Sequence, residues 1–490
     1  MNNTKNETYK KRWIILFTVI SATFMATLDG SIVNVALPNM SDKLGVSMAG
    51  IEWVVTSFFI TIAATILIFG RLGDIKGKMK VFKFGVVVFT LGSFLCGLTH
   101  SLPLLVAARV VQAVGAAATM ATNQGIITHV FPSHERGRAL GMVGTFVALG
   151  SMAGPPIGGL IVSAVSWEYI FLINVPIGII VFTMAMKVLP KSHSVAEEKI
   201  DGKGSVLFTV FIVLLFGALL QGQSMGYNNP PMMGAFIISF ISFVIFIIVE
   251  NKIQVPLLEL GIFKNSLFSI SIICAFISFT AIGASNIILP FYFQDVLKLS
   301  PAATGLFMMV SPVVLSIVAP ISGYMSDKVG SEILTLIGLS FTSVGLFLIS
   351  SLNEKSSLII LVVYIVVMTL GNGMFQSPNN SLVMSTVPKN KLGIAGSVNA
   401  LIRNLGIVLG TSAATLLLYN RMSYKIGYRV VDYVKGRDDV FIYGMRWVYI
   451  SAGIMCVIGV IITALRFYNN KGDKMKPKIK KSKTLEDNAI

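Results

Sequence analysis

Long apolar runs alternate with short polar segments along the whole chain. Fourteen of these runs reach about the 17–25 residues that a helix needs to cross a bilayer. They cover approximately residues 13–38, 51–70, 81–99, 103–127, 138–163, 167–188, 204–221, 232–249, 267–293, 302–324, 333–351, 357–385, 393–418 and 445–468. A backbone in lipid must satisfy its hydrogen bonds within the segment, so runs of this length are helical. The pattern predicts an all-α polytopic membrane protein with fourteen transmembrane helices.

Composition supports this interpretation, and charge sets an orientation. The chain is 54% hydrophobic and only 12% charged, against about 25% charged residues in soluble domains. Its net charge of +17 raises the question of a nucleic-acid partner. However, 28 of the 39 Lys and Arg residues fall in the segments on one side of the runs, and 9 on the other. Because cytoplasmic loops carry the excess of basic residues, we expect both termini in the cytoplasm and no nucleic-acid partner.

The sequence offers no pattern for a metal, a cofactor or a bound nucleotide. Cys96, Cys274 and Cys456 all lie in apolar runs, and the four histidines lie in loops without metal-ligand spacing. The nearest match to a phosphate-binding loop, residues 73–79, lacks the required Ser or Thr. We therefore expect a protein that is not an enzyme, has no cofactor and uses an ion gradient as its energy source.

The chain also repeats itself. Gly70–Gly77 after the second run recurs as Gly323–Gly330 after the tenth, and the glycines of the fifth run recur in the thirteenth. Parallel repeats of this kind build a central site in many transporters. We predict two six-helix bundles with an inserted helix pair. The divisions are a first bundle over 1–190, a cytoplasmic linker and helices 7 and 8 over 191–250, a second bundle over 251–470 and a basic cytoplasmic tail over 471–490.

Five motifs carry a resemblance to a known family. They lie on helix 1, after helix 2, and on helices 4, 5 and 6, at Leu28–Pro38, Gly70–Lys78, Arg109–Gly115, Gly150–Gly159 and Trp167–Gly178. In this order they resemble the fourteen-helix drug:proton antiporter branch of the major facilitator superfamily. The resemblance implies multidrug efflux and antibiotic resistance in a bacterial cell membrane, with protons and a small-molecule substrate as partners. We also expect a monomer in contact with membrane lipids.

The helix 5 motif combines a glycine stripe with two prolines. Gly150, Gly154 and Gly158 follow one another about 40° apart around a helix, so another helix can approach closely. Gly159 completes the motif, and Pro155-Pro156 removes two amide donors and predicts a bend. We expect this stripe to face the other bundle across the interface between the halves.

Charged residues near or inside the apolar runs are the candidates for proton coupling. Asp29 lies about sixteen residues into the first run, where an ionised side chain costs roughly 2.5–3.5 kcal/mol. Arg109 on helix 4 is implicated by the resemblance, and Glu52 at the external end of helix 2 is a further candidate. The structural alternatives are an Asp29 held by Asn34 or a neighbouring helix, an Arg109 in a structural pair and an exposed Glu52 at a helix start. For Arg403 in run 13, the alternative is snorkelling toward the cytoplasm.

The gating candidates share a position near the cytoplasmic ends of helices 2, 5 and 10, and are Asp74, Gly70, Gly77, Arg136, Arg138 and Asp327. The resemblance implies that Asp74 is held by a basic residue and a helix N-terminus in one conformation and released in the other. A partly exposed ion pair is worth only about 0–1 kcal/mol, which suits a contact that breaks in every cycle. We expect Asp327 to be a weaker counterpart, because Ser331 and Glu332 replace basic residues there.

A substrate pocket is expected between the bundles near the membrane midplane. The candidate lining residues are Asp29, Phe58, Phe59, Asn286, Tyr292, Gln294, Met308, Met309, Phe375 and Gln376. Aromatic rings offer cation–π surface, and methionines adapt to varied shapes. We expect a proton-coupled antiporter that exports amphipathic, cationic drugs by alternating access. The alternatives are a proton-driven flippase or exporter of an endogenous lipid, peptide or metabolite, and a non-transporting membrane sensor or scaffold.

Overall fold

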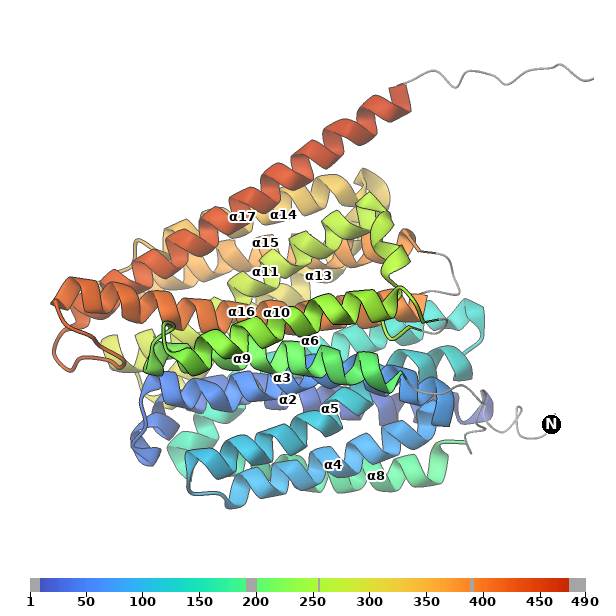
Figure 1. Ribbon diagram of the computed structural model, residues 1–490, viewed down its shortest axis with the longest axis horizontal. Coiled ribbons are helices and arrows are strands. Elements are labelled where there is room, and N and C mark those ends of the chain that lie inside the picture. Colours follow the sequence, from blue (N-terminus) through green and yellow to red (C-terminus); the bar gives the residue numbers. More distant parts are fainter. Residues whose placement is uncertain (1–8, 191–200, 254–255, 388–391, 476–490) are drawn as a thin grey trace, which may run out of the picture.

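The protein is a bundle of long helices in a computed structural model that describes residues 9–190, 201–253, 256–387 and 392–475. These residues form fourteen helical rods, some broken into two helices, whose axes run in broadly the same direction (Figure 1). Thirteen helices within the described ranges are long and apolar enough to cross a membrane. The prediction of an all-helical polytopic membrane protein is confirmed. The side chains of Arg136, Arg138 and Asp327 lie outside the description.

The helices divide into two halves and a connecting pair. The first half contains α2 (Arg12–Leu44), α3 (Met48–Lys76), α4 (Lys78–Leu98), α5 (Leu102–Val130), α6 (Ser133–Ala164), α7 (Tyr169–Leu172) and α8 (Asn174–Val188). The connecting pair is α9 (Gly202–Met225) and α10 (Pro230–Glu250). The second half contains η1 (Leu260–Lys264), α11 (Ser266–Phe291), η2 (Tyr292–Val296), α12 (Pro301–Met308), α13 (Val310–Val329), α14 (Ser331–Ile349), α15 (Leu358–Ser385), α16 (Leu392–Ile426) and α17 (Asp438–Met475).

The repeated segment forms the same turn in both halves. Gly77 separates α3 from α4 with φ 97° and ψ 125°, and Gly330 separates α13 from α14 with φ 97° and ψ 137°. A positive φ of this kind is easily adopted only by glycine. The repeat therefore preserves a backbone conformation that other residues rarely reach.

Equivalent glycines bring equivalent helices together in the two halves. A Cβ added to Gly92 of α4 would lie 2.4 Å from the Gln112 backbone of α5. A Cβ added to Gly345 of α14 would lie 2.4 Å from the Met368 backbone of α15. Both glycines therefore occupy the same place in two copies of one helix pair. This register makes Gln112 the structural counterpart of Met368.

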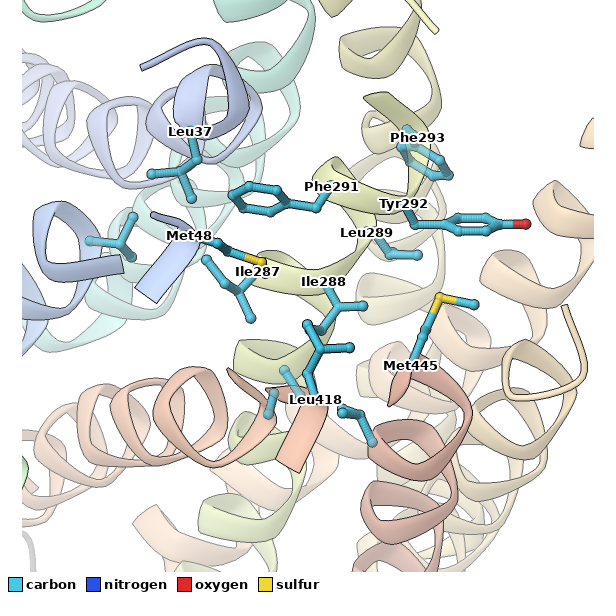
Figure 2. Packing of buried hydrophobic residues seen from close by; sticks show 14 of the residues in the cluster. Leu37, Met48, Ile287, Ile288, Leu289, Phe291, Tyr292, Phe293, Leu418 and Met445 are labelled. Carbon is cyan, nitrogen blue, oxygen red and sulfur yellow. The ribbon is translucent and has the colours of Figure 1, made fainter. Parts of the chain in front are cut away.

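An apolar cluster joins the halves at one end of the bundle, which we call the α2–α3 end after the connection at residues 45–47. Leu37 and Met48 of the first half lie near Ile287, Phe291 and Leu418 of the second half (Figure 2), and each is at most 3% exposed. The opposite end, at Gly77, is called the α3–α4 end. The halves are thus packed tightly together at the α2–α3 end.

The connecting pair lies along the seam between the halves. Figure 1 shows α9 and α10 in front of the line where the two halves meet. Phe208, Ile212 and Phe216 of α9 are buried in one cluster with side chains of α3 and α16. In α10, by contrast, many apolar side chains remain exposed, such as Phe240 at 68%. An apolar helix with so much uncovered surface is suited to contact with lipid.

Candidate functional site

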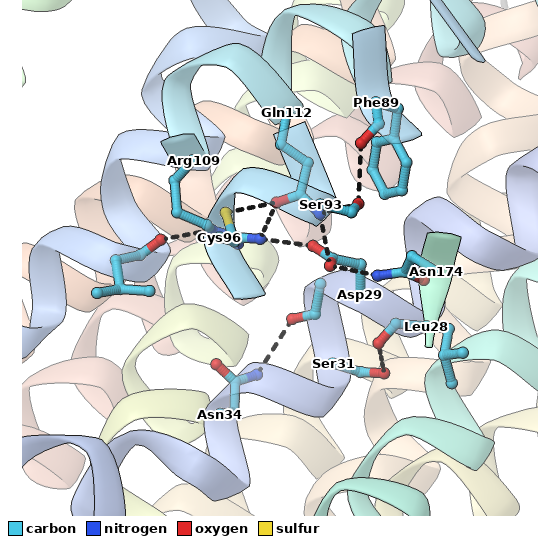
Figure 3. A network of polar contacts seen from close by, with 12 residues as sticks. Leu28, Asp29, Ser31, Asn34, Phe89, Ser93, Cys96, Arg109, Gln112 and Asn174 are labelled. Carbon is cyan, nitrogen blue, oxygen red and sulfur yellow. Dashed lines mark hydrogen bonds and ion pairs between the residues drawn. The ribbon is translucent and has the colours of Figure 1, made fainter. Parts of the chain in front are cut away.

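A buried ion pair lies at the centre of the first half. Asp29 of α2 and Arg109 of α5 are 0% and 1% exposed, and Arg109 Nη1 donates to Asp29 Oδ2 at 2.6 Å. The other oxygen, Asp29 Oδ1, accepts from Gln112 Nε2 and from Asn174 Nδ2, each at 2.8 Å. The carboxylate therefore has three donors supplied by α5 and α8 (Figure 3). Asn34, the expected local partner, instead faces the Gly30 carbonyl oxygen at 3.5 Å.

The Arg109 guanidinium is held by hydrogen bonds and by two aromatic rings. Its Nε donates to the Val54 carbonyl oxygen at 2.9 Å, and Nη1 also donates to Gln112 Oε1 at 2.6 Å. The Phe58 ring lies below it, with 4.1 Å between the guanidinium carbon and the ring centroid, and Phe171 lies at 5.5 Å. Cation–π contacts of this kind are strongest where water is excluded. Phe58 was expected at the surface of a substrate pocket. In the structure it is buried and packs against the guanidinium of Arg109.

The local sequence explains why these groups meet. Arg109 and Gln112 are three positions apart, so both lie on the same side of α5. Gly92 lets α4 approach closely enough for Gln112 Nε2 to donate to Ser93 Oγ at 2.8 Å. Asn174 is the first residue of α8, directly after the break that separates α7 from α8. Four helices of the first half therefore contribute side chains to one network.

The list of candidate residues drawn from the sequence omitted Gln112, Ser93 and Asn174. Gln112 and Asn174 do lie inside the helix 4 and helix 6 motifs. Polar side chains inside apolar runs are themselves a signal of function or of interhelical bonding. A search for polar side chains inside every apolar run would have identified Gln112, Ser93 and Asn174 as candidate site residues.

The second half carries a neutral network at the equivalent level. Met368 stands where Gln112 stands, and Ile365, one turn earlier, stands where Arg109 stands. The polar group there is Asn372, whose Oδ1 lies 3.4 Å from the hydroxyls of Ser278 and Thr342. Among the described residues, the second half therefore has no charged pair at the level of Asp29 and Arg109.

The glycine stripe of α6 packs against α2 of its own half. A Cβ added to Gly150, Gly154 or Gly158 would lie 2.2 Å from Thr27 Oγ1, 1.8 Å from Ser31 Oγ and 2.7 Å from Ile32 Cγ1, respectively. The expectation that this stripe faces the other half is wrong. The second half repeats the arrangement, since Gly406 and Gly410 of α16 pack against Phe276 and Thr280 of α11.

Pro155 and the last glycine of the motif form one of the contacts between the halves. A Cβ on Gly159 would lie 2.4 Å from the Pro301 carbonyl oxygen of α12, and one on Gly305 would lie 2.3 Å from the Pro155 carbonyl oxygen. The helix continues through Pro155 and Pro156 as part of one element. The motif thus has two faces, one inside the first half and one across the seam.

Glu52 is buried between the halves, which excludes an exposed acid at a helix start. It is 0% exposed, and neither carboxyl oxygen has a hydrogen-bond partner. The hydroxyl groups facing it are Ser412 and Thr415 of α16. Those hydroxyls donate to the Val408 and Thr411 carbonyl oxygens of their own helix. A neutral Glu52 suits this place, because a carboxylic acid can donate to a hydroxyl oxygen whereas a carboxylate cannot.

The gating candidates lie at the α3–α4 end. Asp74 is exposed and forms a contact with Lys78 of the following turn. Gly70 lies opposite Ser397 of α16, since an added Cβ would be 3.9 Å from its hydroxyl oxygen. Gly77 forms the turn described above. The side chains of the expected partners Arg136 and Arg138, and that of Asp327, lie outside the description.

The candidate pocket residues fall into two groups. Tyr292 and Phe375 are 0% and 1% exposed, so the structure places them in packed cores and not at a pocket surface. Gln294 is half-buried and donates to the Val35 carbonyl oxygen, a bond between the two halves. The remaining candidates are half-buried: Phe59, Asn286, Met308, Met309 and Gln376. Asp29 was also expected to contact substrate, but in the structure its carboxylate forms an ion pair with Arg109.

These features define a helical membrane transporter built from two repeated halves, with one charged network in the first half. The profile of the Major Facilitator Superfamily matches residues 19–411, and the chain belongs to this family.

Similar proteins include the riboflavin transporter RibZ of Clostridioides difficile (strain 630), 36% identical over 95% of this chain and 99% of that protein. Multidrug resistance protein 3 of Bacillus subtilis (strain 168) is 30% identical over 84% of this chain and 80% of that protein. Among solved structures, a bacterial homologue of the human lysosomal transporter Spinster, described as inward-facing and occupied, matches with a TM-score of 0.67 and 15% identity. That match covers 95% of this chain and 99% of the other. These relatives are transporters and not enzymes.

Proposed function

We propose that this protein is a proton-coupled antiporter that exports amphipathic organic molecules across the cell membrane by alternating access. The observation that supports it best is the Asp29–Arg109 pair, buried in the first half and bonded to amides from two helices. Buried carboxylates in membrane helices are expensive and typically mark proton pathways. The distribution of Lys and Arg supports a cytoplasmic α3–α4 end.

The network offers a physical reason for proton binding to move helices. All three groups that contact Asp29 are hydrogen-bond donors, so a proton added to the carboxyl finds no acceptor among them, and the charge-assisted contact with Arg109 is weakened. Arg109 then lacks its counter-charge. Asn174 Oδ1 is buried without a hydrogen-bond partner, so rotation of that amide would present an acceptor to the new O–H. Protonation would thus rearrange the contacts between α2, α5 and α8.

The driving force available to such a step is sufficient for export. A proton entering the cell gains about 2.3 kcal/mol per 100 mV of membrane potential and about 1.4 kcal/mol per pH unit. One proton could therefore support a substrate gradient of roughly tens- to hundredfold, since each 1.4 kcal/mol corresponds to a factor of about ten.

The substrate class has two candidates. Relatives named multidrug resistance proteins favour amphipathic drugs. The riboflavin transporter, similar over nearly the whole chain, favours an uncharged heteroaromatic metabolite. The paired state of Asp29 argues against direct capture of a drug cation by that carboxylate, because Arg109 already neutralises it. A cationic preference therefore has less support than the sequence motifs suggested.

Proteoliposomes with an imposed pH gradient test the proposal. We expect transport of riboflavin or of ethidium, followed by fluorescence, together with substrate-dependent proton movement reported by a trapped pH-sensitive dye. Asp29→Asn should retain substrate exchange without a gradient and lose gradient-driven accumulation. If this variant is too unstable, Asp29→Asn with Arg109→Gln removes both charges and serves instead. Undiminished proton-driven accumulation in these variants would exclude the coupling role.

A further inference from the structure

Arg403 of α16 is a cation within a membrane-spanning helix, and the described part of the chain places no counter-charge beside it. Among the described residues it has no hydrogen bond, ion pair or ring contact, although its side chain is only partly exposed. The two arginines that are buried in the described helices differ, since Arg109 pairs with Asp29, and Arg466 donates to Ser271 Oγ and Thr335 Oγ1. An arginine at this depth without any acceptor needs one from elsewhere.

The surroundings of α16 indicate which way Arg403 points. Gly396 and Gly410 lie seven residues on either side of it, and seven residues bring a helix back to within about 20° of the same face. On this face, Gly396 meets Gln124 of α5 in the first half, and Gly410 meets Thr280 of α11. The opposite face is covered by α3 and α9, through residues such as Val408. Arg403 therefore lies between a point where this stripe meets α5 of the first half and a point where it meets α11 of its own half.

Depth and neighbours distinguish this arginine from a snorkelling residue. Arg403 is eight residues beyond Ala395, where the apolar span begins, or about 12 Å along the helix. The nearby polar groups are neutral amides. Asn399, one turn earlier, donates to Asn380 Oδ1 at 3.1 Å, and Asn404 donates to the Ala400 carbonyl oxygen at 2.7 Å. No carboxylate within hydrogen-bonding distance is described for this part of α16.

We propose that Arg403 is the substrate-orienting residue of the central site and selects molecules with an anionic or acceptor-rich polar end. Arginine only donates hydrogen bonds, in a planar fork suited to carboxylate, phosphate or paired carbonyl oxygens. The same charge disfavours organic cations at this level of the pathway. This inference rests on the proposed transport function and specifies its substrate class.

Direct binding to the full-length purified protein in detergent tests this assignment without any ion gradient. The probes are riboflavin, which is uncharged and carries carbonyl acceptors, flavin mononucleotide, which adds a phosphate, and ethidium, which is a cation. Each is followed by its fluorescence. We expect Arg403→Gln to weaken flavin mononucleotide binding about tenfold or more, because a hydrogen bond to a charged group is lost. Riboflavin should weaken less, and ethidium should not weaken.

Two further variants keep the outcome interpretable. Arg403→Lys retains the charge and loses the fork, so its affinities should fall between those of the wild type and Arg403→Gln. Arg446→Gln removes one positive charge from an exposed position in the same half and should change nothing. Flavin binding by Arg403→Gln and Arg403→Lys equal to the wild type would overturn the inference. If binding depends on Arg403 but the proteoliposome assay shows no proton movement, the antiport mechanism is refuted and the role of Arg403 stands.

Discussion

The two neighbouring glycines Gly158 and Gly159 of the helix 5 motif face different helices, so adding a methyl group at each one tests a different interface. Its neighbour Gly158 packs inside the first half, where a Cβ would lie 2.7 Å from Ile32 Cγ1 and 2.8 Å from the Ile32 carbonyl oxygen. A Cβ on Gly159 would instead lie 2.4 Å from the Pro301 carbonyl oxygen and 3.0 Å from Ala302 Cα, both in the second half. Gly159→Ala and Gly158→Ala are therefore the same substitution applied to two different interfaces.

The structure sets the expected magnitude. Restoring an ordinary contact of about 3.4–4 Å at Gly159 requires α6 and α12 to separate by about 1 Å, and overpacking of this kind costs typically 1–3 kcal/mol. Gly159→Ala should destabilise only the conformation in which the α2–α3 end is closed. Its population relative to conformations open at that end should therefore fall by roughly 5- to 150-fold, at about tenfold per 1.4 kcal/mol.

The distance between the halves can be measured with spin labels. Val165 at the end of α6 and Leu306 on α12 are 61% and 58% exposed. Cysteines at these two positions can be labelled in a variant whose three buried native cysteines have been replaced. Double electron–electron resonance should show a longer distance population in Gly159→Ala. Gly158→Ala should keep the wild-type distances and lower the melting temperature. Identical distance distributions in the wild type and Gly159→Ala would refute this account of the motif.

Four further variants probe the ion pair, the amide beside it and Glu52. Arg109→Lys keeps the charge but cannot reproduce the planar set of contacts to Asp29, Gln112 and the backbone, so we expect proton-driven transport in proteoliposomes to fall about a hundredfold. Asn174→Leu removes one donor to Asp29 and the unpartnered acceptor, and should reduce substrate-dependent proton movement more than gradient-free exchange. Glu52→Lys places an uncompensated cation in the seam, which costs several kcal/mol, and should lower the melting temperature markedly, whereas Glu52→Gln should leave it nearly unchanged.

The sequence allows the helices and the repeat to be predicted because both depend on local properties. Apolar run length determines which segments span the membrane. The Gly70–Gly77 and Gly323–Gly330 segments repeat because each must form the same positive-φ turn. These features depend on neighbouring residues, so they can be read without knowing what each helix contacts.

Partners across helices are harder to infer from one sequence. Helical periodicity places Gly150, Gly154 and Gly158 on one face, but any helix can approach a glycine face, and the spacing does not say that α2 is the one that does. The same uncertainty applies to Phe58, whose aromatic ring suits both a drug pocket and a guanidinium. In the structure, the guanidinium of Arg109 packs over the ring of Phe58. The residue types indicate which kinds of contact are possible, but the contacting residue becomes known only from the fold.

The distribution of charge between the halves has a consequence for coupling. The ion pair lies wholly in the first half, while Arg403, the unpaired cation proposed to meet the substrate, belongs to the second. In the proposed mechanism, a proton bound at Asp29 would therefore influence the substrate through contacts that cross the seam. The described contacts of this kind include Gly159 with Pro301, Gly305 with Pro155 and Gln294 with the Val35 carbonyl oxygen. These contacts lie on α2, α6, α12 and η2, so in the proposed mechanism a movement of α2 after protonation would reach the second half through them.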